Sequence, residues 1–118
     1  MMKPIDIEVV QKWLDDFTGK NVYVHVETTN GAYSSHFDGK AFNVGAYVRN
    51  AKVSFEQAKI VEANGNSYRV GLKIELGWIY SEGLTDYEIY EEDKLLLAGH
   101  DELGRLMVAL QISETPFE

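Results

Sequence analysis

The residues best suited to chemistry lie close together in the segment HVETTNGAYSSHFD, at positions 25–38. This segment holds His25 and His36, with Glu27 and Asp38 nearby. Two imidazoles and a carboxylate on one side of a sheet could bind zinc or another divalent ion and leave one position open for water. The alternatives are a solvated sheet face whose histidines hydrogen-bond or stack, and the wall of a pocket for a polar ligand.

A tight hairpin would bring these side chains together. Asn30 and Gly31 form the strongest short hairpin signal, and a two-residue loop places His25 opposite His36. Directly opposed residues have Cβ atoms roughly 5 Å apart, and Glu27 would sit diagonal to His36. The spacing therefore predicts His25, Glu27 and His36 as the metal ligands, if a metal is bound. Alternation along the strand assigns the core face to three valines: Val22, Val24 and Val26.

The third histidine, His100, lies in the segment AGHDELG beside Asp101 and Glu102. Aspartate and glycine are typical of turns, and Gly104 suits a left-handed position, so we predict a hairpin turn here. In a metal-dependent enzyme, Asp38 or His100 would act as the general base. The sequence contains no Gly-x-Ser-x-Gly motif, phosphate-binding loop, dinucleotide fingerprint or zinc-protease helix.

Aromatic residues gather in the middle of the chain. Trp78 and Tyr80 share one side of a predicted strand, and Tyr47, Tyr87 and Tyr90 lie in neighbouring segments. Such residues fill cores, line pockets or form partner surfaces, and we predict that they fill the core. For a ligand site, the candidate residues are the two histidines of the first segment and the aromatic pair: His25, His36, Trp78 and Tyr80.

The elements that must position these residues are mostly strands. One helix is predicted over about 6–17, where apolar residues recur with helical spacing, Asp6 can cap the start and Gly19 can end it. Segments after residue 20 alternate, most cleanly where Tyr68, Val70, Leu72, Ile74 and Leu76 share one side. The sequence predicts a mostly β single domain over 1–118. We expect an antiparallel barrel or sandwich of eight or nine short strands with one N-terminal helix, the strands forming an antiparallel meander over 21–113.

A hairpin near the end of the chain is predicted to be central in the sheet. The segments KLLLAG and RLMVALQIS are apolar on both faces. A turn that pairs His100 with Arg105 would place Leu97 opposite Val108 and Leu95 opposite Leu110. A strand that is apolar on both sides belongs where both of its faces are covered.

Composition narrows the function classes. The chain has 118 residues, a net charge of −8 and no cysteine, which excludes disulfides and thiolate chemistry. Its acidic excess repels phosphate backbones and anionic lipids, so we predict no binding to nucleic acid or membranes. The start MMKPIDIEVV does not read as a signal peptide, and no apolar run approaches the length of a membrane span. We expect a cytoplasmic protein.

Four segments also carry a family resemblance: HVETTNGAY, GLKIELGWIYSEGLTDYEI, LLLAGHDELGRLMVALQ and SETPF. They resemble the YojF family of small uncharacterised proteins from spore-forming Gram-positive bacteria, and the resemblance runs over nearly the whole chain. It implies a compact, mostly β domain in the cytoplasm and supplies no catalytic residues. The family's gene neighbourhood beside YojG, a zinc-dependent deacetylase of the kind that acts in bacillithiol synthesis, implies an accessory role.

The leading functional prediction is therefore a non-enzymatic binding or accessory protein without a cofactor, associated with a YojG-type deacetylase and bacillithiol synthesis. One alternative is a metal-dependent enzyme that uses His25, Glu27 and His36. Another is a β-barrel that binds a small polar ligand. We also predict a homodimer, because an open sheet leaves an edge strand that can pair across a two-fold axis.

Overall fold

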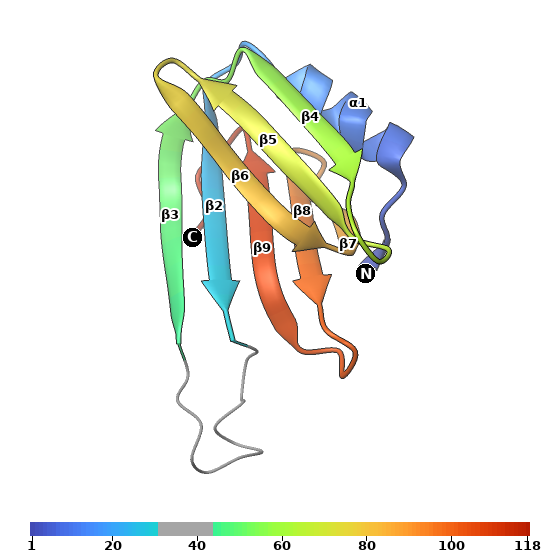
Figure 1. Ribbon diagram of the computed structural model, residues 1–118. Helices are drawn as coiled ribbons and strands as arrows, with labels where there is room; N and C mark the ends of the chain where they lie inside the picture. The colour runs from blue at the N-terminus through green and yellow to red at the C-terminus, as the bar shows by residue number, and fades with distance from the viewer. Residues whose placement is uncertain (31–43) are drawn as a thin grey trace.

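The computed structural model describes residues 1–30 and 44–118, which form an open sandwich of two antiparallel sheets and one helix (Figure 1). The larger sheet has six strands in the order β1-β7-β8-β9-β2-β3, and the smaller has three in the order β4-β5-β6. The sheets do not close on themselves, so the predicted sandwich is confirmed and the predicted barrel is wrong. The elements are β1 (Lys3–Pro4), α1 (Ile7–Phe17), β2 (Val22–Thr29), β3 (Gly45–Val53), β4 (Gln57–Glu62), β5 (Tyr68–Ile74), β6 (Gly77–Leu84), β7 (Asp86–Tyr90), β8 (Lys94–His100) and β9 (Leu106–Ser113).

The helix matches its prediction closely. The Asp6 carboxylate accepts hydrogen bonds from the backbone amides of Glu8 and Val9 and so caps the first turn. Gly19 takes a left-handed conformation with φ +84° just beyond the last turn. The apolar side of the helix is buried in the core, where Trp13 packs at its margin; the fully covered residues are Val10, Leu14 and Phe17. Within the described residues, no helix has the length and apolarity needed to cross a membrane.

Helix α1 extends the smaller layer of the sandwich beyond β4, as Figure 1 shows. Its Gln11 side chain donates to the carbonyl of Ala58 at 3.0 Å and accepts from the amide of Ile60 at 3.0 Å. These backbone groups lie on the edge of β4 that faces away from β5. The glutamine amide therefore takes the place of a neighbouring strand and satisfies this edge.

The core fills the space between the two sheets. Alternate residues of β5, β8 and β9 enter it, and Leu72, Leu95, Leu97 and Leu110 are fully buried. The predicted alternation of β5 holds as far as Ile74. Leu76 is 97% exposed, contrary to the prediction, because it lies in the turn between β5 and β6.

The predicted hairpin around Asn30 and Gly31 is wrong. Strand β2 pairs with β3, with Thr29 opposite Gly45, so the connection is far longer than two residues. The other side of β2 pairs with β9. Both edges of β2 are occupied by these strands, and His25 lies opposite Gln111 of β9. Residues 31–43, which include Gly31, His36 and Asp38, lie outside the described residues.

The hairpin of β8 and β9 is central in the larger sheet, as predicted. Gly104 has the expected left-handed conformation, with φ +76°. The predicted register is wrong, because Leu97 lies opposite Leu110 and His100 opposite Leu106. An irregularity between Gly99 and His100 shifts the pairing there. Leu95, Leu97 and Leu110 nevertheless share one face of the hairpin, as predicted. Strand β1, which pairs with β7, was not expected from the sequence.

Candidate functional sites on the two outer faces

His25 and Glu27 lie side by side on the outer face of the larger sheet. His25 Nε2 is 3.0 Å from Glu27 Oε1, and the imidazole is tilted against the Tyr47 ring at 6.1 Å. His25 is only 7% exposed, and its Nδ1 atom is buried without a hydrogen-bond partner in residues 1–30 and 44–118. The structure thus brings together two of the three predicted metal ligands. Residues 1–30 and 44–118 contain no group of three or more potential ligands placed to hold a metal ion.

A β-bulge opposes His25 on its β3 side. The pairing runs from Val24 with Ala51 to Val26 with Val48, so Arg49 and Asn50 together face the single residue His25. Asn50 has φ +58°, a left-handed conformation that asparagine tolerates better than most residues. On the β9 side, His25 lies opposite Gln111. The bulge thus supplies two polar side chains at one level of the outer face.

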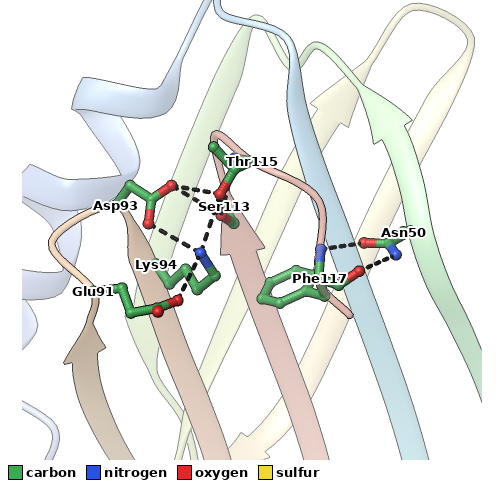
Figure 2. Close-up of polar contacts among 7 residues, drawn as sticks. All are labelled: Asn50, Glu91, Asp93, Lys94, Ser113, Thr115 and Phe117. Atoms are coloured by element: carbon green, nitrogen blue, oxygen red, sulfur yellow. Dashed lines mark hydrogen bonds and ion pairs between the residues drawn. The ribbon is translucent and has the colours of Figure 1, made fainter.

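Both bulge residues hold the C-terminal segment 114–118. The Asn50 side chain accepts from the Phe117 amide and donates to the Phe117 carbonyl, both at 2.7 Å, as Figure 2 shows. The Arg49 guanidinium stacks over the Phe117 ring at 4.8 Å and donates to the Glu118 carbonyl at 2.9 Å. Phe117 is only 8% exposed. The segment is therefore packed on the sheet through both its backbone and its aromatic ring.

A second polar cluster fixes the start of this segment (Figure 2). The Thr115 hydroxyl donates to Asp93 at 2.7 Å, and the Lys94 ammonium donates to Thr115, Asp93 and Glu91, each at 3.1 Å. The Thr115 hydrogen bond, followed by the Lys94 contacts, lowers the pKa of Asp93 despite partial burial. Burial by itself would lower the pKa of Lys94, but the hydrogen bonds to Asp93 and Glu91 outweigh it and raise that pKa. Both groups are therefore charged at neutral pH.

A cavity of about 410 Å³ lies between the C-terminal segment and the sheet. Its lining comes from four strands of the sheet, the β7–β8 turn and the C-terminal segment: Arg49, Tyr90, Glu91, Lys94, Leu96, Gln111, Pro116, Phe117 and Glu118. The turn is unusual because Glu91 and Glu92 have φ +54° and +66°. Consecutive left-handed residues that are not glycine cost free energy, and such strain concentrates at functional sites.

The aromatic pair lies on the outer face of the smaller sheet. Trp78 and Tyr80 are 44% and 58% exposed, and their rings stack at 5.4 Å with an angle of 9° between the planes. The prediction that they fill the core is wrong, because Ile79 and Ser81 take the inward positions of β6. The rings lie over Gly71, where an added Cβ would come within 2.8 Å of the Tyr80 ring. Glycine at this position lets the aromatic pair lie flat on the sheet.

His100 ends β8 and pairs with a neighbouring carboxylate. Its Nδ1 lies 3.1 Å from Asp86 Oδ1, and its backbone amide donates to the Thr85 hydroxyl at 3.1 Å. Asp101 accepts from the backbone amides of Leu103 and Arg105 and so closes the turn, as predicted for this segment. These contacts give His100 and Asp101 roles in shaping the β8–β9 connection.

The predicted ligand residues do not form one site. His25 lies on the outer face of the larger sheet, whereas Trp78 and Tyr80 lie on the outer face of the smaller one. Sequence reasoning missed the residues that hold the C-terminal segment and line the cavity, namely Arg49, Asn50, Lys94, Gln111 and Phe117. The one available signal was an asparagine inside an alternating strand, which is compatible with a left-handed bulge position.

Comparisons with known proteins agree with this fold. Residues 4–117 match the family model described as "Protein of unknown function (DUF1806)". The chain is 55% identical to "Uncharacterized protein YojF" of Bacillus subtilis (strain 168) over 116 residues, covering 98% of each chain. It also matches the crystal structure of Bacillus subtilis YojF protein with a TM-score of 0.80 and 48% identity, over 99% of this chain and 97% of that one.

Proposed function

The chain belongs to the DUF1806 family of proteins of unknown function, and we propose that it is a non-enzymatic binding protein that docks a partner protein. The docking surface is the outer face of the smaller sheet. The observation that carries this proposal is the stacked pair Trp78 and Tyr80, which remains substantially exposed. Tryptophan and tyrosine are the residues that most often dominate the free energy of protein–protein association.

The face around the pair is suited to such a role. β5 is the middle strand of the smaller sheet, and Lys73 lies opposite Trp78, as Gly71 lies opposite Tyr80. The stacked rings are already ordered before binding, so little side-chain entropy is lost when a partner covers them. An added Cβ at Gly71 would lie 2.8 Å from the Tyr80 ring, so glycine at this position lets the pair lie close to the sheet.

The charges on this face indicate the kind of partner. Lys59, Arg69 and Lys73 lie on its outward positions. Arg69 is 3.8 Å from Glu82 and Lys73 is 3.2 Å from Glu56, so three cations face two paired carboxylates. This local excess of positive charge stands out on a chain whose net charge is −8. We propose a partner with an acidic surface around an apolar centre, because complementary charge directs encounter and fixes orientation.

The resemblance to the YojF family suggests a YojG-type deacetylase of bacillithiol synthesis as the first partner to test, with both proteins in the cytoplasm. The double variant Trp78→Ala/Tyr80→Ala should weaken the complex by at least about 30-fold in isothermal titration calorimetry, the effect of losing a central hot spot. The matched control is Leu103→Ala, which removes a 76% exposed side chain from the β8–β9 loop. A deacetylase that fails to bind the wild type overturns the choice of partner. Equal binding by the folded double variant overturns the docking face.

A metal-dependent enzyme built on His25, Glu27 and His36 remains the second candidate, and the 3.0 Å contact between His25 and Glu27 is the observation in its favour. A metal would have to displace that contact, because the imidazole Nε2 is already engaged. We propose that the protein works without a metal. Titration with zinc, manganese or nickel should then give the same result for wild type, His25→Ala and His36→Ala. Stoichiometric metal binding by the wild type that either substitution abolishes would support the metal-dependent enzyme instead.

A further inference from the structure

We infer that the cavity under the C-terminal segment binds a small organic carboxylate that also carries an ammonium or hydroxyl group. The cavity lies on the larger sheet, away from the aromatic docking face, so the inference is independent of the proposed function. Its volume of about 410 Å³ suits a small molecule. Three features of its walls define the ligand.

Hydrogen-bond donors converge on one side of the cavity. Arginine has only donors, so Gln111 must turn its Oε1 toward Arg49, at 3.4 Å. The Gln111 Nε2 group then faces away from Arg49 and makes no hydrogen bond to any described residue. Arg49 also keeps N–H groups beyond the two bonded to Gln111 and Glu118. Two adjacent donor groups, one of them a planar cation, suit a carboxylate.

The opposite side of the cavity offers an acceptor. Glu91 bonds to Lys94 through Oε1 at 3.1 Å, and its side chain is 58% exposed. Its second carboxylate oxygen makes no hydrogen bond or ion pair with a described residue. The left-handed backbone of Glu91 belongs to the β7–β8 hairpin turn, and the residue lines the cavity from there. An ammonium or hydroxyl group of a ligand is the natural partner for that oxygen.

The remaining walls are apolar or aromatic and fit a short carbon skeleton. Leu96 lies opposite Gln111 on the sheet, and Pro116, Phe117 and Tyr90 complete the enclosure. The cationic side chains Arg49 and Lys94 are balanced by the acidic side chains Glu91 and Glu118. A multiply charged anion such as phosphate therefore gains little here, whereas a ligand with separated opposite charges matches both ends.

The test uses ω-amino carboxylates of increasing length, from glycine to 6-aminohexanoate, titrated into the full chain and followed by two-dimensional NMR. We expect saturable shifts at Arg49, Gln111 and Glu91, with one length preferred. Propionate should bind more weakly, and inorganic phosphate should give no saturable shifts. Glu91→Gln should weaken the preferred amino carboxylate by roughly 10-fold while leaving propionate unchanged, because it removes only the charged acceptor.

Two controls make the result decisive. Glu92→Gln changes the neighbouring left-handed residue of the same turn, which does not line the cavity, and should bind like wild type. Gln111→Met removes the amide donor and should weaken amino carboxylate and propionate alike. The inference is overturned if no carboxylate gives saturable shifts at the cavity, or if Glu91→Gln and Glu92→Gln have equal effects.

Discussion

Gly99 on β8 packs directly against the backbone carbonyl of Gly83 on β6. A Cβ atom on Gly99 would lie 2.0 Å from the Gly83 oxygen and 2.6 Å from the Val108 side chain. The contact lies where the chain leaves the smaller sheet and enters the larger one through β7. Close approach of the two sheets at this corner therefore requires glycine.

Gly99→Ala should destabilise the fold by at least about 1–3 kcal/mol, because a backbone carbonyl cannot move aside as a side chain can. Urea denaturation followed by tryptophan fluorescence measures the loss. Gly77→Ala is the matched control, since a Cβ there meets nothing within 4 Å. Equal stability of the two variants would show that the sheets do not approach in this way.

Replacing Gln11 tests how the edge of β4 is covered. Gln11→Ala leaves the Ala58 carbonyl and the Ile60 amide without the partners that the glutamine supplies. The expected loss of stability is about 1–3 kcal/mol in thermal or chemical denaturation. Lys12→Ala, at the next and exposed position of the same helix, should change stability by less than about 0.5 kcal/mol.

Asn50 has two separable roles, one in conformation and one in hydrogen bonding. Asn50→Gly keeps the left-handed backbone but loses both bonds to Phe117, whereas Asn50→Ala also incurs about 1–2 kcal/mol of backbone strain. Stability should therefore fall in the order wild type, Asn50→Gly, Asn50→Ala. Hydrogen exchange at the Phe117 amide should accelerate in both variants. An unchanged exchange rate would show that the Asn50 side chain does not hold the Phe117 backbone in place.

Acid should loosen the start of the C-terminal segment. The pKa of Asp93 is lowered in the folded protein, first by the Thr115 hydrogen bond and then by Lys94. Its contribution to stability is thus complete above the ordinary pKa of 3.8 and is lost as the pH falls through the lower folded value. Asp93→Asn should flatten this part of the stability curve between about pH 2 and pH 5. A curve as steep as that of wild type would assign the acid sensitivity to other carboxylates.

We propose that the protein forms a homodimer through β3. This strand is the last in the larger sheet and has no further neighbour among the described strands, and Tyr47 and Val48 are 71% and 53% exposed on it. A second copy could pair with this edge in antiparallel fashion across a two-fold axis. Light scattering should give the mass of two chains for wild type and one for Val48→Lys. A monomeric wild type at high protein concentration would refute the dimer.

The sequence by itself determined the local elements. Helical spacing with a cap at Asp6 placed α1 within a residue, and alternation assigned Val22 and Val24 to the core. Gly104 was recognised because a left-handed turn position favours glycine wherever it occurs. These features depend on residues a few positions apart, so their physical cause is contained within the segment itself.

The tertiary structure alone decided which strands meet and which faces are covered. The Asn30 signal favoured a tight hairpin, but β2 instead pairs along both edges with β3 and β9. Alternation put Trp78 and Tyr80 on one side of β6 without saying whether that side faces the core. The cavity likewise forms only because the bulge on β3 binds the C-terminal segment, which follows nearly 70 residues later in the chain. Asn50 of the bulge is hydrogen-bonded to Phe117 of that segment. Period-two patterning fixes which residues share a face, whereas register and the covering of that face are set by the packing of distant segments.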